Sequence, residues 1–182
     1  MPISLVRAIL HAHIPADDRE RECLRRINEL VATSATPFSR NHFVPGHLTA
    51  SAIVVDPARE HTLLVFHAKL QIWVQPGGHF EEGEWDPSLA AAREVLEETG
   101  LDTRWPGEVP KLLDTDVHPI PARKADPAHE HFDLRMLLIA DRTDARAGDD
   151  GVSEVRWVGK KEWQAMNLDP GLQRALKKIW GR

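Results

Sequence analysis

The sequence predicts one layered α/β domain with a helical N-terminal extension. Three observations lead to this fold class. Strand-like and helix-like patterns are mixed along the whole chain, no internal repeat or low-complexity segment occurs, and 182 residues fit one domain of ordinary size rather than two. We expect residues 1–46 to form an N-terminal helix and connector, and residues 47–182 to form the main domain.

In the first half of the chain, Asp17 or Asp18 can cap a helix that ends before residues 33–37. Its apolar residues recur at helical spacing: Cys23, Leu24, Ile27, Leu30 and Val31. After a polar connector, residues 48–55 and 62–67 predict a β-hairpin, because Asp56-Pro57 can open a turn between them. A short strand at 71–74 would then end at Pro76-Gly77-Gly78.

In the second half, Asp86 can cap and Pro87 can begin a helix that runs to Thr99 and ends at Gly100. Further strands are expected at residues 111–117, 132–140 and 154–158, and a last helix begins at Asp169-Pro170. Between them, three prolines predict an irregular loop over 118–128, and a turn-rich stretch covers 143–151.

Composition excludes several classes of protein. The one cysteine, Cys23, cannot form a disulfide within the chain and is expected in the core, which indicates a reduced, cytoplasmic protein. Apolar runs fall far short of the ~20 residues that span a bilayer, so we expect no membrane partner. A net charge of −5 argues against a nucleic-acid partner.

The acidity is concentrated in one segment. Residues 81–98 carry seven acids against one base, Arg93, so the local charge is −6 and the remainder of the chain is about +1. On the predicted helix, Glu94, Glu97 and Glu98 share a sector of about 100°. Helical spacing alone favours an ordinary solvated face, but the adjacent Gly77-Gly78 backbone could approach a ligand, and Mg²⁺ would relieve the repulsion between the carboxylates.

These residues carry a family resemblance. Gly78-x5-Glu84, followed by Arg93-Glu94-Val95-Leu96-Glu97-Glu98-Thr99-Gly100-Leu101, resembles the Nudix box of the Nudix hydrolases. The family pattern places seven residues between the first Glu and the Arg, whereas eight, residues 85–92, stand here. An extra residue before the helix start keeps the register of Arg93 to Gly100 and affects only the alignment of Glu84. More loosely, the resemblance covers residues 48–179.

The resemblance implies an α/β/α sandwich around a mixed sheet, and a metal-dependent pyrophosphohydrolase that cleaves the diphosphate bridge of a nucleoside diphosphate linked to another moiety. Glu94, Glu97 and Glu98 would bind Mg²⁺ or Mn²⁺ with the backbone of Gly78, and Arg93 would position Glu94. Glu84 would be a supporting acid. The partner would be a small nucleotide, and a homodimer is possible. The alternative is a catalytically silent Nudix-like module that binds a nucleotide.

The general base is left open. His129, His131 and Asp133 should share one face of an extended segment, with Glu130 on the other. Segment 129–133 is the candidate source of the base, because it offers Glu130 and the imidazoles of His129 and His131. Alternatively, Glu94 or Glu97 takes the proton through a bound water, and this segment shapes the pocket.

Other residues could contact substrate or metal. His129 and His131 could contact substrate with Gly77 and Gly78, and Trp73 could stack a nucleobase. Arg123 and Lys124 could meet phosphate. We expect His11, His13, His42 and His47 to be ordinary surface histidines, because no third ligand completes a zinc site in the sequence.

Overall fold

A computed structural model describes residues 2–123, 126–143, 145–148 and 151–181. Its helices are α1 (Pro2–Ala12), α2 (Asp18–Thr33), α3 (Pro87–Thr99), α4 (Pro170–Trp180) and the short 3₁₀ helix η1 (Trp163–Ala165). Its strands are β1 (Gly46–Val55), β2 (His61–His67), β3 (Ile72–Val74), β4 (Gly77–His79), β5 (Lys111–Ile120), β6 (His129–Ile139) and β7 (Val152–Gly159).

The strands form one mixed sheet in the order β3-β2-β1-β6-β5. β1 runs parallel to β6 from Gly46 opposite Glu130 to Val55 opposite Ile139, while β5 and β6 are antiparallel. β2 pairs with β1 only next to their connecting turn, at Val55 opposite Thr62, and continues with β7. The other end of β1 is therefore free to pair with β4.

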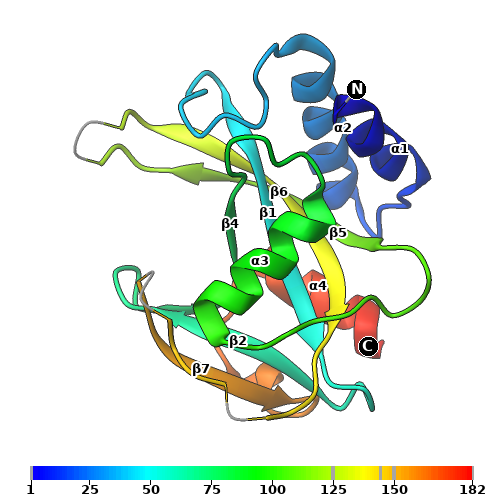
Figure 1. The fold of residues 1–182 in the computed structure, drawn as a ribbon, viewed down its shortest axis with the longest axis vertical. Coiled ribbons are helices and arrows are strands. Elements are labelled where there is room, and N and C mark those ends of the chain that lie inside the picture. The colour runs from blue at the N-terminus through cyan, green and yellow to red at the C-terminus, as the bar shows by residue number, and fades with distance from the viewer. Residues whose placement is uncertain (1, 124–125, 144, 149–150, 182) are drawn as a thin grey trace.

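Helices cover both faces of the sheet, with α3 in front of β1 and α4 behind it (Figure 1). Alternate side chains of β1, from Leu48 to Val54, pack with α1, α2 and α3 in one buried cluster. Ile53 and Val55 point the other way and pack against α4 in a second cluster. The predicted α/β fold with an N-terminal helical extension is confirmed. The boundary at residue 46 stays a prediction, since α1 and α2 contribute to the same core as the sheet.

The predicted helix starts and ends depend on local capping, and the structure confirms them. The Asp86 side chain accepts a hydrogen bond from the backbone N–H of Ser88, and Asp17 and Asp169 cap α2 and α4 in the same way. Gly100 ends α3 in the left-handed conformation with φ 70°, which glycine adopts without a steric penalty. Local capping residues thus fix both ends of α3, which carries the predicted box and which we call the box helix.

Three elements differ from the prediction. Helix α1 was not expected; its Val6 and Leu10 are buried in the core. The irregular loop predicted from 118 is wrong in its first part, because β5 continues to Ile120 and tolerates Pro119 as an edge strand. Gly77–His79, expected to be only a turn, pairs with β1 as β4. In the predicted turn, residues 144 and 149–150 lie outside the described part.

No helix in the described ranges has the length and apolar character needed to cross a membrane.

Candidate active site

A cavity of about 1630 Å³ opens where β4 joins β1, between α3 and the segment 34–41. The acidic face of α3 forms one wall, and polar side chains of β1 and β6 contribute to another. Predicted site residues that line the cavity are Gly77, Gly78, Arg93, Glu94, Glu97, Glu98 and His131. The fold therefore brings most of the predicted site to one place.

Arg93 organises the carboxylates, which we call the box cluster together with it: Glu84, Arg93, Glu94, Glu97 and Glu98. Its guanidinium donates to Glu84 at 2.9 and 3.2 Å, to Glu94 Oε1 at 3.0 Å and to Glu97 Oε2 at 2.8 Å. A further bond of 2.9 Å reaches the carbonyl oxygen of His79 in β4. Despite the extra residue between Glu84 and Arg93, the two side chains meet.

Gly77 and Gly78 lie against the carboxylates of Glu98 and Glu94. The backbone N–H of Gly77 donates to Glu98 Oε2 at 3.1 Å. A Cβ at Gly78 would lie 2.7 Å from Glu94 Oε1, closer than real Cβ contacts, so a side chain here would displace the Glu94 carboxylate. Burial raises the pKa of Glu94, and the nearby Glu97 and Glu84 add to this rise while Arg93 opposes it. Three carboxylates thus share Arg93, and a fourth, that of Glu98, is held by the backbone of Gly77.

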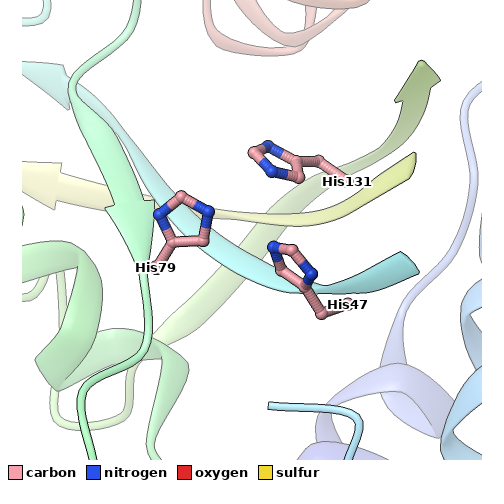
Figure 2. A group of neighbouring side chains, drawn as sticks. All are labelled: His47, His79 and His131. Carbon is pink, nitrogen blue, oxygen red and sulfur yellow. The ribbon is translucent and has the colours of Figure 1, made fainter. Parts of the chain in front are cut away.

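Three imidazoles meet beside this wall, in what we call the histidine cluster: His47 of β1, His79 of β4 and His131 of β6 (Figure 2). Their ligand nitrogens lie within 4.8 Å of one another, and their ring centroids are 4.9–5.1 Å apart. Burial, together with a smaller effect of the neighbouring imidazoles, lowers the pKa of His47 and of His79 to about 4 and the pKa of His131 to about 2.

The expectation that His47 is a surface histidine is wrong, because its side chain is 1% exposed. His13 is also not a free surface residue, since its ring is paired with the buried Glu20. His47 stands opposite His131 in the parallel β1–β6 ladder, and His79 pairs with Thr49, two residues along the same face. Tertiary pairing, which the sequence pattern does not report, assembles this cluster.

Asp133 lies next along this face of β6 and is fully engaged. It accepts hydrogen bonds from Thr49 at 3.2 Å, from Ser51 at 2.8 Å and from Gln75 at 3.3 Å. Arg135 adds an ion pair at 3.1 Å. Asp133 thus fixes the floor of the cavity rather than holding a free carboxylate there.

Several predicted residues lie elsewhere. Glu130 points away from His131, as the strand alternation predicts, and its carboxylate pairs with Arg26 of α2. Trp73 packs 5.3 Å from the ring of Phe66. His129 donates to the carbonyl of Pro127 and stacks on His47, with ring centroids 5.0 Å apart, so it adjoins the histidine cluster. Glu130, Trp73 and His129 are not among the described residues that line the cavity. Their functional roles stay predictions.

The sequence pattern does not predict a group of aromatic side chains at the cavity. Phe38 contacts Phe80 and Trp85 edge-on, with ring centroids 5.0 and 5.3 Å apart. The cation Arg123 lines the cavity as well, whereas Lys124 lies outside the described residues. Trp85 lies in the segment 85–92 that holds the extra residue, a position that could have suggested it, but Phe38 comes from the connector, where no motif marks it.

The family model described as NUDIX domain matches residues 45–179 of the chain, which include β1 to β7 and nearly all of α4. Among curated protein sequences, none matches.

Solved structures share the fold. A hydrolase of the NUDIX family from Clostridium perfringens is 22% identical, with a TM-score of 0.56 over 78% of this chain and 97% of that one. The NUDIX domain of Shewanella oneidensis NrtR, solved with ADP ribose, is 16% identical over 83% and 94%, with a TM-score of 0.56. The dihydroneopterin triphosphate pyrophosphohydrolase of E. coli is 16% identical over 72% and 92%, at 0.54.

Proposed function

Because the chain belongs to the Nudix hydrolase family, we propose that it is a metal-dependent pyrophosphohydrolase that cleaves the diphosphate bridge of a nucleoside diphosphate linked to another moiety. The observation that supports this most is the box cluster, in which Arg93 pairs with Glu84, Glu94 and Glu97, while Glu94, Glu97 and Glu98 line a large open cavity. That excess of negative charge is suited to cations that a phosphate substrate brings or shares.

The donor set fits Mg²⁺ or Mn²⁺. Glu94, Glu97 and Glu98 present carboxylate oxygens, the ligand type that these hard cations prefer, and Gly78 brings its backbone against Glu94. The oxygens need not converge as tightly as in a protein cage, since Mg²⁺ keeps several waters and binds substrate phosphates. When bound, such an ion supplies charge neutralisation at the phosphate chain and a more acidic water.

The protein residues then have distinct tasks. Arg93 holds Glu84, Glu94 and Glu97 in fixed positions, and the Gly77 N–H holds Glu98. These bonds keep the carboxylates oriented toward the cavity before substrate arrives, which reduces the reorganisation needed for catalysis.

Other lining residues suit the two ends of such a substrate. Cations line the cavity away from the box and suit a phosphate chain: Arg7, Arg40, Lys69 and Arg123. Phe38 and Trp85 give the cavity an aromatic edge against which a nucleobase can stack.

The proposal is tested by offering nucleoside triphosphates, nucleotide sugars and dinucleotides with Mg²⁺ or Mn²⁺, and identifying products by chromatography. ADP-ribose and dihydroneopterin triphosphate belong in the screen, because related structures name them. We expect a nucleoside monophosphate among the products, and no turnover in the presence of a chelator.

The matched variant is Glu98→Gln, which keeps the size of the side chain and removes one carboxylate charge. Hydrolysis should fall by at least about 10²-fold while the melting temperature changes little. Tight nucleotide binding without turnover under every condition would instead identify a silent binding module. Wild-type turnover in Glu98→Gln would exclude the box as the metal site.

A further inference from the structure

The histidine cluster has the composition of a second, chemically different metal site. His47, His79 and His131 come from three strands and place one nitrogen each within 4.8 Å of the other two. Figure 2 shows one nitrogen of each ring turned toward the space between the rings. Within the described part of the chain, these are the only three histidine, cysteine or acidic residues that converge in this way.

The hydrogen bonds of His47 favour a ligand role. Its Nδ1 lies 3.1 Å from the carbonyl oxygen of His42, an arrangement in which Nδ1 carries the proton and Nε2 carries the lone pair. Nε2 is buried and has no hydrogen-bond partner among the described residues. A carbonyl that orients one nitrogen while the other faces a shared space is the usual arrangement around a metal-bound histidine.

Each ring of the cluster can supply one ligand, because an imidazole binds a metal through its unprotonated nitrogen. Desolvated lone pairs without partners are costly, and a bound cation would remove that cost.

We propose that His47, His79 and His131 form a binding site for Zn²⁺, separate from the carboxylates of the box cluster. Imidazole nitrogens suit Zn²⁺, whereas Mg²⁺ prefers oxygen, so donor type divides the two ions between the two sites. Nitrogens bound to a tetrahedral Zn²⁺ lie about 3.4 Å apart, so modest ring rotations close the site.

The position of the site gives it access to the cavity. His79 and His131 line the cavity, whereas His47 lies behind them, buried. Three protein ligands leave a coordination position open on the cavity side. The backbone of His79 also accepts a hydrogen bond from Arg93, so the ion would hold β4 in place next to the box cluster. Binding of Zn²⁺ requires no nucleotide and can be measured whether or not the chain hydrolyses one.

The test is equilibrium dialysis of the metal-depleted full chain against Zn²⁺, with metal content measured by mass spectrometry. We expect one tightly held equivalent that excess Mg²⁺ does not displace. His79→Ala should weaken its binding by at least about 100-fold. As matched controls, His118→Ala, next to the cluster on β5, and His11→Ala, exposed on α1, should keep the affinity.

Co²⁺ gives a second readout on the wild-type chain, independent of whether any variant folds. Substitution by Co²⁺ should produce the visible absorption of a tetrahedral site with nitrogen ligands. Absence of that absorption would overturn the proposal, as would Zn²⁺ binding that survives His79→Ala. Loss of the tight equivalent in Glu94→Gln and Glu98→Gln, but not in His79→Ala, would place the ion in the box cluster instead.

Discussion

Two groups of carboxylates in this molecule meet opposite electrostatic surroundings. The box cluster has four carboxylates and one arginine, a formal charge of 1 − 4 = −3. The second group, which we call the buried ionic network, joins β5 and β6 to helices α2 and α4 and has four carboxylates: Glu20, Asp114, Asp116 and Asp133. Among the described residues, four cations pair with these: Arg19, Arg135, Arg174 and Lys178. Its formal charge is 4 − 4 = 0.

The balance of charge identifies the buried ionic network as the structural group of the two. In the buried ionic network, Arg174 bonds Asp114 at 2.8 and 2.9 Å, and Arg135 reaches Asp114, Asp116 and Asp133. Each charge there has its counter-charge, as burial demands. Glu94, Glu97 and Glu98 of the box cluster line an open cavity, so of these two groups of carboxylates the box cluster is the one suited to a cation from solution.

The largest expected effect comes from removing a cation of the buried ionic network. Arg135→Met leaves three buried carboxylates short of a partner and should lower the free energy of unfolding by about 3–5 kcal/mol. Arg93→Met removes the one cation of the box cluster, whose guanidinium is partly exposed, and should lower it by about 1 kcal/mol while abolishing most hydrolysis. Urea denaturation measures both. Equal losses of stability in Arg135→Met and Arg93→Met would contradict the structural role of the buried ionic network.

The second effect concerns acid stability. Burial by itself would raise the pKa of Glu20, but hydrogen bonds from His13, Ala16 and Lys178 outweigh it and lower the pKa to about 2 from 4.5. A lowered folded pKa stabilises the protein above the unfolded value, and this contribution disappears as the pH falls from about 4.5 to about 2. Glu20→Gln should therefore cost about 2–3 kcal/mol at neutral pH.

The difference between wild type and Glu20→Gln should then narrow as the pH is lowered through that window, which urea denaturation at several pH values measures. Glu22→Gln, on the exposed side of the same helix, is the control and should show no comparable loss. A cost at neutral pH that persists undiminished near pH 2 would mean that Glu20 acts through packing rather than charge.

The box helix could be predicted from the sequence because its determinants are local. Asp86, Pro87 and Gly100 fix its ends, and the acidic face follows from helical periodicity. The buried ionic network could not be predicted, because it joins Glu20 to Lys178, 158 positions apart in the chain. The histidine cluster likewise depends on the register of β1 against β6 and β4, which tertiary packing sets. Helix α1 has no acidic residue in its first turn and carried little local signal.

The third effect concerns the binding of Mg²⁺ to the box cluster. Millimolar Mg²⁺ should raise the melting temperature by about 2–4 °C, since it binds the folded box cluster and not the unfolded chain. The double variant Glu97→Gln/Glu98→Gln should lose this shift. The matched control is Glu22→Gln/Glu29→Gln, which removes two exposed carboxylates that flank Arg25 and should keep the shift. A shift retained in the box variant would place the cation elsewhere.

The smallest effect concerns Glu130, which lies in neither group. If Glu130 were the general base, Glu130→Gln would lower kcat strongly and change the pH profile of kcat. The carboxylate instead pairs with Arg26 of α2, on the side of β6 away from His131. We therefore expect kcat to change by less than about threefold with the same pH profile, because only an ion pair between α2 and β6 is lost. Arg26→Gln, which removes the same pair from the other side, should match it in both kcat and melting temperature. A fall of kcat in Glu130→Gln but not in Arg26→Gln would show that the carboxylate itself takes part in proton transfer, and that β6 moves to present it when substrate binds.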